Sequence, residues 1–144
     1  MNKFYHKPKN VLPGVFLDHE TGKLKIYGQS CTVNADEFYA PILEWFDNYL
    51  EYPHKSTVLD ISLSYFNTVS AKFIMIILKK METLSKKGKK VKIRWFYQKL
   101  DEDLQEAGED FETIIDVEFE FVIIGNKDDE SKGFQDFDHL IDDI

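Results

Sequence analysis

The side chains best suited to chemistry lie where a predicted strand ends and a predicted helix begins, in the segment Tyr65-Phe66-Asn67-Thr68-Val69-Ser70. Open α/β folds tend to place functional groups at the carboxyl ends of strands. The first turn of a helix has unpaired amide groups and a positive dipole end, so it tolerates a phosphate well. Thr68 could therefore be phosphorylated without harm to its own fold. The added charge, roughly −1.5 to −2, would act mainly on a partner surface.

Helix capping explains the same residue types. Asn67 and Thr68 are both of types favoured at the N-cap, and Ser70 suits a first turn. From the residues alone, two interpretations stay open. The segment is either a phosphorylation site at Thr68 or the capped start of a helix without a switch.

The sequence contains no arrangement typical of catalysis, of a metal site or of a cofactor site. No glycine-rich phosphate loop follows a strand, and no Gly-x-Ser-x-Gly elbow is present. The histidines and the single cysteine lack partners at the spacing of metal ligands: His6, His19, His54, His139 and Cys31. We therefore predict a protein that is not an enzyme and that uses no metal and no cofactor.

Charge is unevenly distributed along the 144 residues. Residues 1–100 contain 16 basic and 9 acidic residues, whereas residues 101–144 contain 2 basic and 17 acidic residues. An acidic chain is a poor nucleic-acid binder, because phosphate attraction dominates that binding. The lysine-rich stretch 79–94 is interpreted as a solvated helix end and turn.

The longest apolar run, residues 73–78, is too short to span a bilayer. We expect a cytoplasmic protein that binds neither nucleic acid nor membrane.

The hydrophobic pattern predicts strands and helices in alternation. A β-hairpin is expected at 15–17 and 24–28, followed by a helix from Asn34 or Asp36 to about Tyr49. A strand at 56–65, a helix ending at Gly88, a strand at 91–97, a helix over 104–115 and a strand at 117–124 complete the order β-β-α-β-α-β-α-β. This order predicts an α/β fold with a mixed, mostly parallel sheet, an N-terminal hairpin and helices packed on one face.

Residues 1–125 are predicted to form a single domain, and residues 126–144 an acidic C-terminal tail or short helix. Apolar residues in this tail have the spacing of a weak amphipathic helix: Phe134, Phe137, Leu140 and Ile141. The tail is interpreted either as frayed or docked on the domain, or as a segment that docks on a partner.

Two blocks of the sequence resemble the SiaC family, bacterial STAS-like proteins of biofilm and aggregation signalling that are related to anti-sigma-factor antagonists. The segment 65–70 is similar to the family's tyrosine-x-asparagine-threonine-serine-serine segment. Arg94-Trp95-Phe96-Tyr97 and the acidic stretch 101–111, which contains Gly108, are similar to its tryptophan-x-tyrosine strand end and acidic helix.

This resemblance implies a STAS-like fold and a non-enzymatic switch. It implies that Thr68 is phosphorylated by a dedicated Ser/Thr kinase and dephosphorylated by a PP2C-type phosphatase, and that the unphosphorylated protein binds and activates a diguanylate cyclase. The residues around Thr68 are then expected to contact or support the partner surface: Tyr65, Phe66, Asn67, Val69 and Ser70. The alternatives are a constitutive interaction or scaffold domain without a switch, and an anti-sigma-factor antagonist.

Overall fold

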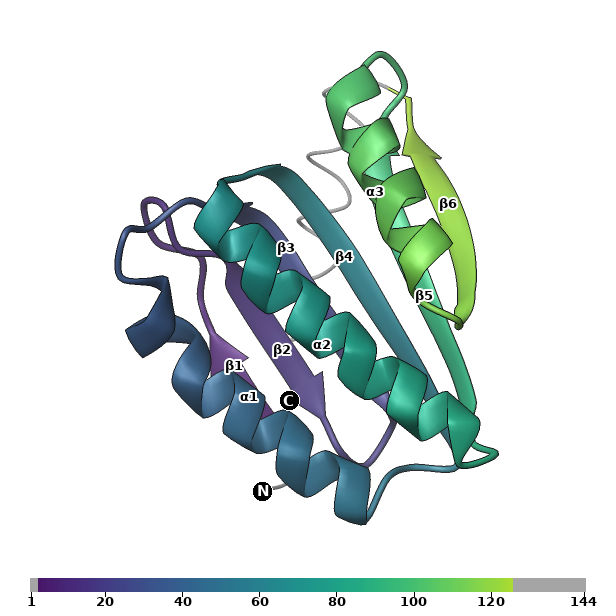
Figure 1. The fold of residues 1–144 in the computed structure, drawn as a ribbon. Helices are drawn as coiled ribbons and strands as arrows, with labels where there is room; N and C mark the ends of the chain where they lie inside the picture. Colours follow the sequence, from purple (N-terminus) through teal and green to yellow (C-terminus); the bar gives the residue numbers. More distant parts are fainter. Residues whose placement is uncertain (1–2, 126–144) are drawn as a thin grey trace.

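A six-stranded sheet forms the frame of the protein. The computed structural model describes residues 3–125, and the strands follow the chain in the order β1-β2-β3-β4-β5-β6 (Figure 1). The strands are β1 Lys3–His6, β2 Gly14–Asp18, β3 Lys23–Ser30, β4 Ser56–Phe66, β5 Lys90–Gln98 and β6 Glu118–Ile124. The pairs β1–β2 and β2–β3 are antiparallel, and the pairs from β3 to β6 are parallel.

Three helices lie together on one face of this sheet, as Figure 1 shows. They are α1 Ala35–Glu51, α2 Thr68–Lys86 and α3 Glu102–Ile114. Each helix connects two neighbouring parallel strands, and all three crossovers step in the same direction across the sheet. Because such crossovers share one hand, the helices must lie on the same face. The predicted α/β fold with its mixed, mostly parallel sheet is confirmed.

The structure differs from the predicted order by one strand. Lys3–His6 forms β1, which pairs with β2 and makes the N-terminal unit a three-stranded antiparallel sheet. Four residues with half-exposed side chains give too short a pattern to predict a strand. Helix α1 begins directly after Asn34, which is one of the two predicted N-cap residues. The Asn34 side chain makes no capping hydrogen bond. The tail prediction for residues 126–144 falls outside the described residues.

The core lies between the sheet and the helices. Alternate residues of β3, β4 and β5 point toward the helices and are fully buried there, among them Ile26, Leu59 and Ile93. Aromatic side chains of α1 and β5 fill much of the remaining space: Tyr39, Phe46, Tyr49 and Trp95. No helix among residues 3–125 is long and apolar enough to cross a membrane.

Helix α3 lies very close to β5, and Gly108 permits this approach. A Cβ atom at Gly108 would lie 2.6 Å from the Trp95 ring and 2.9 Å from the Phe121 ring. The indole Nε1–H of Trp95 donates to the Leu104 carbonyl at 3.0 Å, so the ring cannot easily move away. The acidic glycine-containing helix is therefore held against the strand by a contact that only glycine allows.

We predict that Gly108→Ala destabilises the protein by about 1–3 kcal/mol, because the new methyl group overpacks the contact with Trp95. Urea denaturation measures this change in the free energy of unfolding. Helix propensity alone predicts the opposite sign, a gain of about 1 kcal/mol for glycine to alanine. A more stable variant would contradict the packing argument.

Candidate functional site

Thr68 is the first residue of α2, directly after the strand β4 and the single residue Asn67. Its side chain is exposed, and within residues 3–125 its hydroxyl has no hydrogen-bond partner. Asn67, with an extended backbone (φ −88°, ψ 175°), occupies the N-cap position instead. The strand-to-helix junction is therefore where the sequence predicts it, and the capping role belongs to Asn67.

Asn67 fixes the start of α2 through three hydrogen bonds. Its Oδ1 accepts from the Ser70 amide at 2.9 Å, which caps the helix. Its own amide donates to the Ser30 carbonyl at 3.0 Å, and its Nδ2 donates to the Thr32 carbonyl at 3.4 Å. Asn67 thus joins the start of α2 to the end of β3 and to the connection that leads into α1.

A buried chain of hydroxyl groups lies beneath this junction. The Ser30 hydroxyl donates to Ser70 Oγ at 2.7 Å and lies 2.7 Å from the Tyr39 hydroxyl. Burial raises the pKa of the Tyr39 phenol, and the hydrogen bond to Ser30 opposes this shift. The Tyr39 ring stacks on Phe73 of α2, with centroids 5.1 Å apart. These contacts link β3, α1 and α2 at one point.

Ser70, one of the residues expected to contact or support the partner surface, is not exposed. Its side chain is fully buried and takes part in the hydroxyl chain with Ser30. Direct contact between Ser70 and a partner would require this part of the core to open. The structure therefore assigns Ser70 to the support of the site. The sequence could not show this, because Ser30 is 40 residues away from Ser70.

Phe66 supports the site from the side of α3. It is half-buried, with its ring centroid 6.2 Å from that of Trp95 in an edge-to-face contact and 6.4 Å from that of Phe111. Aromatic pairs of this kind add to the stability that burial provides. The two blocks that carry the family resemblance are therefore in contact, because Phe66 belongs to the first and Trp95 and Phe111 belong to the second.

Two apolar side chains beside Thr68 remain accessible. Tyr65 is 56% exposed and Val69 is 43% exposed. A groove of about 330 Å³ is lined by residues of β4 and of the start of α3: Ser64, Tyr65, Phe66, Asp101, Asp103, Leu104 and Ala107. Asp101 also caps α3, because its Oδ1 accepts from the Leu104 amide at 3.0 Å. Exposed aromatic and aliphatic groups next to a groove suit contact with another protein.

The charge around Thr68 favours an anion at this position. The first turn of α2 contains no acidic residue. Lys72 is exposed and follows Thr68 at the i, i+4 spacing, which places both side chains on the same side of the helix. The unpaired amides of the first turn add a positive partial charge. A phosphate on Thr68 would thus be stabilised by its own helix.

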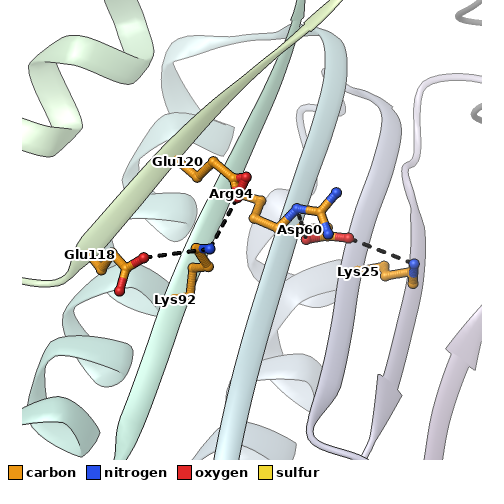
Figure 2. A network of polar contacts seen from close by, with 6 residues as sticks. All are labelled: Lys25, Asp60, Lys92, Arg94, Glu118 and Glu120. Atoms are coloured by element: carbon orange, nitrogen blue, oxygen red, sulfur yellow. Dashed lines mark ion pairs between the residues drawn. The ribbon is translucent and has the colours of Figure 1, made fainter.

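A second polar cluster lies on the opposite, helix-free face of the sheet (Figure 2). Lys25 Nζ is 3.7 Å from Asp60 Oδ2, and Arg94 Nε is 3.5 Å from Asp60 Oδ1. Lys92 pairs with Glu118 and Glu120 on β6. Burial raises the pKa of Asp60, against the influence of Arg94 and Lys25, and lowers the pKa of Lys25. Among residues 3–125, no group of three or more His, Cys, Asp or Glu side chains is placed to hold a metal ion.

Comparison with known proteins gives a consistent result. The sequence model described as "SiaC family regulatory phosphoprotein" matches residues 6–124. An uncharacterized protein of Pseudomonas aeruginosa (strain UCBPP-PA14) is 32% identical over 111 residues, which are 77% of this chain and 86% of that protein.

Solved structures show the same fold. The crystal structure of apo-SiaC from Pseudomonas aeruginosa is similar with a TM-score of 0.78 and 26% identity, over 85% of this chain and 99% of that one. In the crystal structure of the diguanylate cyclase SiaD in complex with its activator SiaC, also from Pseudomonas aeruginosa, the similar chain gives a TM-score of 0.79 and 27% identity. That match covers 83% of this chain and 98% of the other.

The hydrogen bonds at the junction predict different effects for neighbouring substitutions. Asn67→Ala removes the cap and should lower the free energy of unfolding by about 1 kcal/mol. Thr68→Ala removes no hydrogen bond found in residues 3–125 and should change it by less than about 0.5 kcal/mol. Urea denaturation of both variants measures the difference.

Asn67→Asp is the matched control, because aspartate keeps the oxygen that accepts from the Ser70 amide and suits a helix N-terminus. This variant should retain most of the wild-type stability. A larger loss for Thr68→Ala than for Asn67→Ala would show that Thr68 is the cap after all.

Proposed function

This chain belongs to the SiaC family of regulatory phosphoproteins, and from that premise we propose that it is a non-enzymatic switch protein controlled at Thr68. In this proposal a Ser/Thr kinase phosphorylates Thr68 and a PP2C-type phosphatase restores the hydroxyl. The unphosphorylated protein binds and activates a diguanylate cyclase. The observation that carries the proposal is the exposed Thr68 hydroxyl at the first residue of α2, beside accessible apolar groups.

The geometry of the junction supports phosphorylation of the folded protein. Thr68 is exposed, so a kinase can reach its hydroxyl without unfolding α2. Since Asn67 supplies the cap, phosphorylation of Thr68 leaves the capping hydrogen bond in place. The amides of the first turn and Lys72 favour the added charge. The modification therefore changes the surface of the protein and preserves its fold.

The same position explains how phosphorylation would control binding. Tyr65 and Val69 flank Thr68 and offer exposed apolar area to a partner. A phosphate between them carries roughly −1.5 to −2 charge, and its burial under a partner would be costly without a matching cation. The unphosphorylated surface therefore suits an interface, and the phosphorylated surface opposes it.

The partner class is inferred from similarity. The SiaC of Pseudomonas aeruginosa is described as the activator of the diguanylate cyclase SiaD and has been solved in complex with it. The structural match covers 98% of that SiaC chain and 83% of this chain. A diguanylate cyclase is therefore the partner that we propose for the surface around Thr68.

A constitutive scaffold domain is the main alternative, and one observation weighs against it. That interpretation explained Thr68 as a helix cap, but the cap is Asn67, and the Thr68 hydroxyl makes no hydrogen bond within residues 3–125. Capping therefore does not account for a hydroxyl at position 68.

Phosphorylation can be mapped directly. Incubation of the full chain with its cognate kinase and ATP, followed by peptide mass spectrometry, should locate the phosphate on Thr68. Thr68→Ala should abolish the modification, whereas Thr83→Ala, a change of an exposed threonine in the last turns of α2, should leave it intact. A phosphate found elsewhere, with Thr68 unmodified, would refute the assignment.

Partner binding should depend on charge at position 68. Thr68→Glu should weaken the affinity for the cyclase at least about tenfold, or about 1.4 kcal/mol, because a carboxylate must be buried at the interface. Thr83→Glu, which adds the same charge at the distant end of α2, should bind like the wild type. Isothermal titration calorimetry compares the three proteins, and equal affinities would count against the switch.

Tyr65 should be an anchor of the same interface. Tyr65→Ala should cost about 1–2 kcal/mol of binding free energy, with little loss of stability, since more than half of the side chain is exposed. Tyr52→Ala, at an exposed tyrosine beyond the end of α1, is the matched control. If Tyr65→Ala binds as tightly as Tyr52→Ala, the interface lies elsewhere.

A further inference from the structure

A pocket of about 510 Å³ lies where β4 and β5 begin and α2 ends. The register of the two strands places Ser56 directly beside Lys90, and Ser85 in the last turn of α2 also lines the pocket. Thr68 is at the opposite end of α2, a helix of 19 residues that is about 28 Å long. The pocket is therefore separate from the candidate site.

Two cations of this pocket are not neutralised by the fold. Lys89 and Lys90 line it with exposed side chains, and neither forms an ion pair within residues 3–125. Lys92 also lines the pocket, but it is already paired, 3.5 Å from Glu118 and 3.1 Å from Glu120 (Figure 2). Neighbouring like charges repel each other. An anion bound beside Lys89 and Lys90 would relieve this repulsion.

The needs of the helix do not explain these two lysines. A cation in the last turn compensates the dipole of α2, and Lys86 supplies it. The solvated helix end predicted from the sequence accounts for this residue. Lys89 follows the turn, and Lys90 is the first residue of β5, an interior strand of the sheet. Since lysine is depleted in strands, its presence here calls for a separate reason.

Hydroxyl groups complete a set of donors around the pocket. No hydrogen bond among residues 3–125 uses the side-chain hydroxyl of Ser56 or of Ser85, and both residues are half-buried. The backbone at both positions is fixed. His54 Nδ1 lies 3.0 Å from the Ser56 carbonyl oxygen, and the Gly88 amide donates to the Ser85 carbonyl at 3.0 Å. Gly88 has a φ of 89°, the left-handed conformation that favours glycine in such a turn.

We propose that this pocket binds a small molecule with a diphosphate group. Ammonium groups and hydroxyls are the donors that phosphate oxygens accept from in proteins. In this arrangement Lys89 and Lys90 pair with the phosphate oxygens, and the hydroxyls of Ser56 and Ser85 donate to them. Two unpaired cations match two adjacent phosphate groups better than a single one. The volume of the pocket falls in the range of small-molecule sites, and the proposal is independent of the role of Thr68.

The lining and the overall charge limit which phosphate ligand fits. Among residues 3–125 no aromatic side chain lines the pocket, so no ring there can stack on a nucleotide base. A nucleic acid or an anionic membrane is attracted by an extended basic surface, whereas this chain has a net charge of −8 at pH 7. A soluble ligand that is recognised through its phosphates is therefore the class that these residues favour.

Titration of the full chain with pyrophosphate, in a buffer free of divalent cations, tests the proposal. Calorimetry should show saturable binding, and the amide NMR resonances of residues 85–90 should shift. The double variant Lys89→Gln, Lys90→Gln should weaken the affinity at least about tenfold, because two charge-assisted hydrogen-bond donors are lost. The matched control is Lys7→Gln, Lys9→Gln, which removes the same charge from exposed lysines between β1 and β2 and should bind like the wild type.

Four results would overturn the proposal. The first is the absence of saturable pyrophosphate binding. The second is equal affinity of the two double variants, because only the general charge of the protein would then attract the anion. The third is equal affinity for orthophosphate and pyrophosphate, which would remove the preference for a diphosphate. The fourth is tighter binding of a single-stranded oligonucleotide or of vesicles with anionic phospholipid, since the lysines would then serve a larger phosphate surface.

Discussion

The arrangement of the candidate site depends on the hydrogen bonds that tie the start of α2 to the end of β3. Asn67 is held by the Ser30 and Thr32 carbonyls and in turn caps α2 through the Ser70 amide. Below it, the hydroxyls of Ser30, Ser70 and Tyr39 form a buried chain. Since every polar group in this region must find a partner when buried, the junction has little freedom. Thr68 is thereby presented to solvent from a fixed position.

This construction separates the switch residue from the residues that support it. Asn67 and Ser70 carry the hydrogen bonds, Phe66 anchors the strand end against Trp95, and the Thr68 side chain itself contributes none of these contacts. A modification at position 68 can therefore change the charge of the surface without cost to the fold. A switch that acts by controlling a partner needs this property, since both states must remain folded.

Much of the fold follows from the sequence, but the support of the site does not. Alternating β-branched residues in 56–65 predict β4, and apolar stripes predict the helices, because periodicity reports which face is buried. The short strand β1 gives no such signal. The placement of Ser70 shows a second limit, since the sequence indicates only a first-turn residue beside the site and its hydrogen bond to Ser30 places it in the core. A contact between residues 40 positions apart depends on tertiary packing, which local pattern cannot reveal.

The most direct test of the central claim compares the phosphorylated and unphosphorylated forms of the same chain. The protein is converted fully to the form phosphorylated at Thr68, verified by intact mass, and its affinity for the diguanylate cyclase is measured by calorimetry. The account predicts tight binding of the unphosphorylated form, loss of at least about tenfold in affinity on phosphorylation, and full recovery after phosphatase treatment. Equal affinity of the two forms would contradict it.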